Sequence, residues 1–203
     1  GQVLARIDGA RISTADEDAI EDSQRLTSGG MIFGTIDYLA PEAAFGMELV
    51  FERYGLADHL RGRGYEHFVV DTEPVVGRDR QSLKVFGDES RREVLIELVV
   101  GETFVESAGR LLSIEWLLLQ DPRRAADPER ALLPGQKYPG LGCLHIVVGM
   151  LVMAAERLAF EGVSLVPTHF HVAARAKRLF TFLDPAHEAR YLALARATHG
   201  LPL

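Results

Sequence analysis

The chain has 203 residues, of which 47% are hydrophobic and 25% charged, an ordinary globular composition that suffices for one large domain or two small ones. Its formal net charge of −7 argues against nonspecific binding to nucleic acid, which requires a positive face, although a local basic cluster can still hold a phosphorylated small molecule. Because Cys143 is the sole cysteine, neither an intrachain disulfide nor a cysteine-rich zinc site can form, and a reducing, cytoplasmic setting fits.

Residues 1–30 are acidic and polar, so we expect an N-terminal arm there, followed by a single domain over residues 31–203. No linker rich in Ser, Gly or Pro divides the chain into two apolar halves. The first residues lack the basic n-region of a signal peptide, and the apolar run at residues 146–155 is too short to cross a membrane. We therefore expect no association with a membrane.

Helical periodicity begins after Pro41, a residue that suits the first turn of a helix. The apolar residues that recur at this spacing are Phe45, Leu49, Val50, Tyr54, Leu56 and Leu60. The segment 61–64 holds two arginines and two glycines, so we expect the helical region to end there, with its basic charge matching the helix dipole.

Strand-like runs follow, separated by short segments rich in turn-forming residues. They lie at residues 67–70, 82–86, 94–104 and 111–120. Short loops between successive strands predict an antiparallel meander.

The remaining pattern predicts a long apolar helix, a short strand and two further helices. These elements are expected at residues 143–160, 163–166, 173–180 and 188–198, and Pro185 is expected to break the chain between the last two helices. The whole order predicts an α/β (α+β) domain with a mixed, mostly antiparallel central sheet flanked by helices.

A loop with two glycines lies between the last strand of the meander and the long apolar helix. It reads Lys137-Tyr138-Pro139-Gly140-Leu141-Gly142. Glycines allow a tight turn and a close approach to a ligand, and the N–H groups of the following helix point into the same loop, where they can hold an anion such as a phosphate. The alternative is an ordinary connection between strand and helix.

This loop and one helix carry a resemblance to the GNAT superfamily of acyl-CoA-dependent N-acyltransferases. The spacing Lys137-x-x-Gly140-x-Gly142 resembles the family pattern Arg/Gln-x-x-Gly-x-Gly/Ala, and Ala176-x-x-Leu179-Phe180 resembles a frequent pattern that ends in Tyr. The resemblance covers roughly residues 40–185.

The resemblance implies a GNAT-like fold, a small-molecule ligand that is acetyl-CoA or another acyl-CoA, and acyl transfer to an amine that the sequence does not name. The coenzyme A pyrophosphate would be held by Lys137, Gly140, Leu141, Gly142, Cys143 and Leu144. Three departures stand against it. Lys137 replaces Arg or Gln, residues 120–133 form an unusually long polar insertion, and Phe180 occupies the place of the tyrosine that usually donates a proton.

Glu115 is the first candidate for catalysis, because it lies within an apolar strand, where burial would raise the pKa of a carboxyl group toward that of a general base. The resemblance implies the same role for a glutamate in a central strand. The alternative is a glutamate on the solvent-facing side of an edge strand.

His169 and His171 form a second candidate at the corner between strand and helix. In an extended stretch both side chains share a face, so they can bind one metal if His145, Asp71 or Glu115 adds a third ligand. Either imidazole can instead transfer a proton near neutral pH, or the pair can simply cap the helix. We expect no tightly bound metal.

Other reactive or basic residues follow the same region. Cys143 stands at the expected helix N-terminus, a position that lowers the pKa of a thiol, but we expect it to pack and to offer its backbone N–H. Arg123, Arg124 and Arg130 form a basic rim for phosphates or a solvated loop.

Three functions therefore remain open from the sequence. The first is an N-acyltransferase that uses Glu115, His169 or His171. The second is a non-catalytic GNAT-fold module for ligand binding or structure, which Phe180 favours, and the third is a metal-dependent hydrolase built on the two histidines. We expect no nucleic-acid partner, and a homo-oligomer stays open.

Overall fold

A computed structural model describes residues 3–6, 42–75, 80–127, 132 and 135–198, and of residues 3–6 and 42–45 it describes the backbone alone. Most of the expected N-terminal arm lies outside this part of the chain. Within it, no helix combines the length and the apolar character needed to cross a bilayer.

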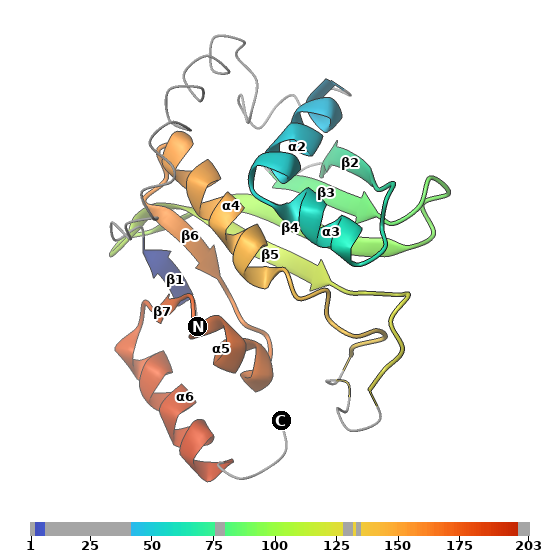
Figure 1. Ribbon diagram of the computed structural model, residues 1–203. Helices are drawn as coiled ribbons and strands as arrows, with labels where there is room; N and C mark the ends of the chain where they lie inside the picture. The colour runs from blue at the N-terminus through green and yellow to red at the C-terminus, as the bar shows by residue number, and fades with distance from the viewer. Residues whose placement is uncertain (1–2, 7–41, 76–79, 128–131, 133–134, 199–203) are drawn as a thin grey trace, which may run out of the picture.

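The described residues form a seven-stranded sheet (Figure 1). The strands are β1 (Val3–Arg6), β2 (Val69–Pro74), β3 (Arg80–Phe86), β4 (Val94–Val105), β5 (Gly109–Leu119), β6 (Gly162–Leu165) and β7 (Thr181–Phe182), in the spatial order β2-β3-β4-β5-β6-β1-β7. Strands β2 to β5 form the expected antiparallel meander, and β5 pairs with β6 in parallel. The prediction of a mixed, mostly antiparallel sheet flanked by helices is therefore confirmed.

Five helices lie in the described part: α2 (Glu42–Arg53), α3 (Leu56–Gly62), α4 (Leu144–Arg157), α5 (Phe170–Ala176) and α6 (Pro185–Ala197). Figure 1 shows α2, α3 and α4 over one face of the sheet, with α5 and α6 beside the β7 end. The apolar sides of the first three helices form one buried cluster with the facing side chains of the sheet. This core includes Phe51, Leu56, Leu60, Ile96, Leu98, Val147 and Leu151.

Strand β1 was not expected from the sequence. Its four residues pair antiparallel with β6, from Val3 opposite Leu165 to Arg6 opposite Gly162, and Val3 and Leu4 also pair with β7. The beginning of the chain therefore joins strands that lie more than 150 positions away in the sequence.

The start of α6 corrects another expectation. Pro185 does not merely break the chain but occupies the first turn of α6, which begins three residues earlier than the periodicity suggested. The side chain of Asp184 accepts a hydrogen bond from the N–H of Ala186 at 2.8 Å and so caps the helix.

The pairing of β4 with β5 contains an irregularity that changes which side chains share a face. Val99 pairs with Trp116 and Val100 with Ile114, so Glu115 is the extra residue of a β-bulge. Glu115 pairs with Arg80 at 2.6 Å. The half-exposed Trp116 donates a hydrogen bond from Nε1 to Glu97 at 2.9 Å, so the bulge places a charged and polar surface beside the apolar core.

The expected helix after Pro41 is divided into two by Gly55, whose φ of 73° lies in the left-handed region. A helix cannot continue through this conformation, and residues other than glycine adopt it at a cost. The division lets α2 and α3 bring separate apolar sides, Phe51 on one and Leu60 on the other, into the same core.

We predict that Gly55→Ala lowers the free energy of unfolding by about 1 kcal/mol, because the added methyl group has space but the backbone conformation is strained. Gly46→Ala is the matched control, since Gly46 lies within α2 and also has open space around it. There the higher helix propensity of alanine should raise stability by about 0.5–1 kcal/mol. Urea unfolding of both variants gives the comparison, and a Gly55→Ala protein as stable as the wild type would contradict this account of the break.

Candidate functional site

The loop at residues 137–142, which we call the glycine loop, lies along the end of β5. The N–H of Asp121 donates to the carbonyl of Pro139 at 2.8 Å, and the N–H of Leu141 donates to the carbonyl of Leu119 at 3.4 Å. Gln120, between these two, donates instead to Leu95 of β4. Backbone groups alternate in direction along a strand, so the loop occupies the edge of β5 that faces away from β4.

This edge of β5 is left open between β6 and the glycine loop. Strand β6 pairs with β5 from Leu111 to Ile114, and the loop meets β5 again at Leu119. By the same alternation, the backbone groups of Trp116 and Leu118 point toward β4, and those of Leu117 point to the other edge. In the described part of the chain, Leu117 has no backbone partner on that edge. Unpaired backbone groups at a strand edge can hydrogen-bond to a carbonyl or amide of a ligand.

Helix α3 holds the glycine loop from the other side. The ring of His59 donates from Nε2 to the carbonyl of Leu141 at 2.9 Å. A side chain at Gly142 would place its Cβ 2.9 Å from Nη2 of Arg63, and Gly142 has a φ of 83°. The backbone conformation therefore favours glycine at this position, and a side chain there would also have to displace the flexible guanidinium of Arg63.

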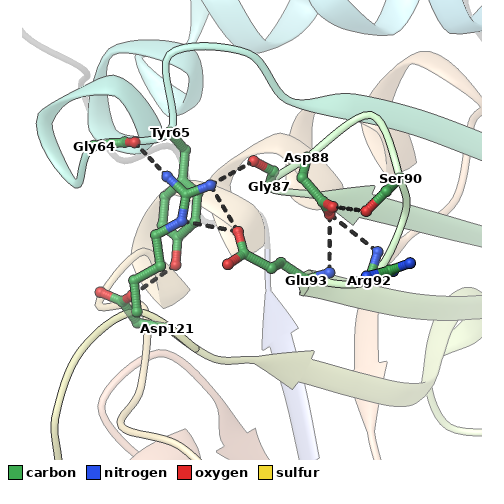
Figure 2. Close-up of polar contacts among 9 residues, drawn as sticks. Gly64, Tyr65, Gly87, Asp88, Ser90, Arg92, Glu93 and Asp121 are labelled. Carbon is green, nitrogen blue, oxygen red and sulfur yellow. Dashed lines mark hydrogen bonds and ion pairs between the residues drawn. The ribbon is translucent and has the colours of Figure 1, made fainter.

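The carboxylate of Asp121 contacts the segment that follows α3 (Figure 2). Its side chain is buried and accepts a hydrogen bond from the hydroxyl of Tyr65 at 2.7 Å. Nη1 of Arg63 lies 3.4 Å from the same carboxylate. Burial and the bond to this carboxylate hold the pKa of the Tyr65 hydroxyl above its usual range. The hydroxyl therefore remains protonated and serves as a donor at physiological pH.

Arg123 is part of this scaffold and not of a free basic rim. Its guanidinium lies 4.4 Å from the centre of the Tyr65 ring and donates to the carbonyls of Gly64 and Gly87 at 2.7 and 3.0 Å. It also pairs with Glu93. These contacts account for its donors, so Arg123 joins three segments of the chain. Arg130, another arginine of the expected rim, lies outside the described residues.

The remaining residues of the expected pyrophosphate site flank this loop. Lys137 is exposed, with Nζ 5.1 Å from the ring centre of Tyr138. Gly140 and Gly142 are also exposed, whereas Leu144 begins α4 and is half-buried. The loop thus presents backbone and a lysine to solvent beside the N-terminus of α4.

The structure places Glu115 and the two histidines in surroundings that differ from those expected from the sequence. Glu115 is exposed and paired with Arg80, instead of being isolated within the core. His169 occupies the N-cap position of α5, although its side chain makes no capping hydrogen bond, and His171 lies in the first turn; their rings stack with centres 5.4 Å apart. Burial, and secondarily the neighbouring His169 and Arg175, lower the pKa of His171, so its neutral form is favoured at pH 7.

Among the residues that the structure describes, no three side chains of His, Cys, Asp or Glu lie together as a set that could hold a metal ion. Among the described residues, no hydrogen bond or ion pair joins Glu115 to either histidine. The structure thus brings together the glycine loop, α3 and the end of β5, with the stacked histidines in a separate pair.

His59, Arg63 and Asp121 were not singled out by the sequence analysis. His59 and Arg63 are four positions apart and so share one side of α3, which is a signal that a helical-wheel argument can detect. Asp121 follows an apolar strand directly, but nothing local indicates that it is buried or which residues it meets.

In comparisons of the chain with known proteins, no family model, no curated protein and no solved structure matches it.

The thiol of Cys143 behaves differently from a cysteine at an accessible helix N-terminus. Its side chain is buried, and this burial raises its pKa to about 11. The expected lowering of the pKa by the helix is therefore overruled by desolvation. A neutral, enclosed thiol is a packing residue and a poor nucleophile.

We predict that Cys143 reacts with Ellman's reagent at pH 8 more than about 100-fold more slowly in the native protein than in urea, because both the thiolate fraction and access are reduced. The measured reaction rate belongs to Cys143 alone, because the chain has one cysteine. The folded pKa lies above the unfolded value of about 8.5, so the stability due to the neutral thiol is complete below that pH and is lost as the pH rises toward 11. A native rate within tenfold of the unfolded rate would contradict the buried position.

Proposed function

We propose that the protein is an acyl-CoA-dependent N-acyltransferase of GNAT-like architecture. The observation that carries the proposal is the open edge of β5, where the backbone groups of Leu117 have no partner between the parallel strand β6 and the glycine loop in the described part of the chain. A ligand that binds the loop with one end can reach backbone donors of a central strand with the other. The spacing of Lys137, Gly140 and Gly142 supports the same choice of ligand.

The residues at the loop fit a pyrophosphate. Gly142 is exposed and lacks a side chain, and the guanidinium of Arg63 lies directly beside it. Arginine and backbone N–H groups at the start of a helix are suited to phosphate oxygens. Lys137 adds a second cation on the exposed side of the loop. Bound acyl-CoA would supply the acyl thioester.

An acyltransferase must also help an amine to attack the thioester carbonyl of the bound acyl-CoA. An attacking amine has to lose a proton while the new carbon–nitrogen bond forms and the carbon–sulfur bond breaks, and the departing thiolate has to gain a proton. His171 is the candidate to accept a proton, because it lies in α5, the element that follows β6, and its lowered pKa keeps the imidazole neutral at pH 7. Within the part of the chain that the structure describes, no hydrogen bond or ion pair joins either histidine to the glycine loop, so the substrate would have to reach from one to the other. The backbone N–H groups of β5 would stabilise negative charge on the carbonyl oxygen.

A non-catalytic GNAT-like module is the second candidate, and Phe180 favours it. This side chain is buried and carries no hydroxyl, so it cannot protonate a leaving thiolate. A protein with the ligand site but without an acid at this place would bind and not turn over. No observation in the described residues favours the hydrolase alternative.

We expect coenzyme A to raise the melting temperature of the protein, because a ligand that binds the folded state stabilises it. Arg63→Gln should weaken coenzyme A binding by roughly tenfold or more through the loss of a charged phosphate contact. Arg61→Gln is the matched control, since Arg61 pairs with Glu52 away from the loop. Each variant is compared with its own melting temperature without ligand, which separates binding from stability.

Release of free thiol from acetyl-CoA, measured with a panel of amines, then separates the two candidates. For an enzyme, His171→Ala should lower kcat by about 10²- to 10⁴-fold, the usual effect of losing an acid or base. Binding of coenzyme A without turnover would favour the non-catalytic module. No thermal shift with coenzyme A or acetyl-CoA would refute both.

A further inference from the structure

A cavity of about 100 Å³ lies within the core, between α2, α4 and the sheet. Helix α2 contributes Met47 and Phe51, and α4 contributes Met150 and Ala154, while Leu98 of β4 is among the sheet residues that close it. The residues that line it do not include those of the glycine loop. The cavity is therefore separate from the site to which we assign acyl transfer.

The lining of this cavity selects a narrow class of ligand. Thr72, Gln81 and Ser82 are among the residues that line it, but the surface they and the others present to the space is almost entirely carbon, and no charged side chain contributes to it. Water requires two to four polar partners to occupy such a space, and a charged group would lose its hydration without compensation. Both ordered water and charged ligands are therefore disfavoured.

An apolar ligand has a physical advantage here. Protein interiors are packed as densely as organic crystals, so side chains around an empty space of this size lose van der Waals contacts that a hydrocarbon would restore. An engineered cavity of about 150 Å³ with a similar aliphatic and aromatic lining binds benzene, and one water accounts for about 30 Å³ of liquid. By this scale the cavity holds about three to six carbon atoms.

The wall along α4 also indicates a shape. Its lining residues run from Val147 within α4 to Leu158, the C-cap residue, and lie on one side of the helix over roughly 16 Å at 1.5 Å per residue. A space bounded along three turns of one helix suits a narrow ligand lying parallel to the helix axis.

We propose that this cavity binds a slender, uncharged apolar ligand, either a short hydrocarbon chain or a small ring, between α2 and α4. The proposal rests on the cavity alone and is independent of whether the glycine loop binds coenzyme A.

Methionine methyl NMR tests the proposal directly, because the chain has four methionines and two of them, Met47 and Met150, line the cavity. Met153 lies on the same helix α4 outside the lining and serves as an internal control. Benzene and 1-butanol should shift the Met47 and Met150 signals saturably while Met153 stays in place, and butyrate should shift none of them. Absence of a saturable shift, or an equal shift at Met153, would overturn the proposal.

A substitution that fills the cavity gives the second test. Ala154→Leu should abolish the probe-induced shifts and raise the melting temperature by about 2–4 °C, the usual gain from filling a cavity in a domain of this size. Gly149→Ala, on the exposed side of α4 with open space around it, should leave probe binding unchanged. If Ala154→Leu instead lowers the melting temperature and the wild type shows no probe shift, side chains of the protein already fill the space and the proposal fails. If Ala154→Leu does not fold, the wild-type titration still decides.

Discussion

The buried carboxylate of Asp121 is the interaction on which the geometry of the candidate site depends. A charged group away from water is tolerated when its hydrogen-bonding capacity is met, and here Tyr65 and Arg63 supply the donors. The N–H of the same residue binds the carbonyl of Pro139. Asp121 thus connects the end of β5 with the region after α3 and with the glycine loop, and Arg123 covers the Tyr65 ring from outside.

The position of the loop follows from these bonds. Because Asp121 and Leu119 hold it along one edge of β5, and because β6 stops pairing at Ile114, the backbone groups of Leu117 that face this edge stay open between them. The same bonds bring Arg63 beside Gly142. A cation, an exposed glycine backbone and the open backbone edge of β5 at Leu117 are thereby assembled from three segments distant in the sequence.

Much of the framework could be predicted because its causes are local. Alternating apolar residues and short turns identified the meander, and two glycines before an apolar run identified the loop. The bulge at Glu115 could not be predicted, since it arises from pairing with Val99 and Val100, and it leaves this glutamate exposed beside Arg80. Strand β1 and the partners of Asp121 depend likewise on contacts between remote segments, and the raised pKa of Cys143 depends on burial that the sequence does not show.

Amide hydrogen exchange of Leu141 in the wild type and in Asp121→Ala tests the central claim that Asp121 positions the glycine loop. We expect the Leu141 amide to exchange at least about tenfold faster in the variant, beyond the change in the core strands β3 and β4, because loss of the carboxylate frees Arg63 and Tyr65. Exchange of amides in β3 and β4 of the same sample corrects for any general loss of stability. Leu141 exchange that changes no more than that of the core strands would show that the loop is held independently of Asp121, and would contradict the account.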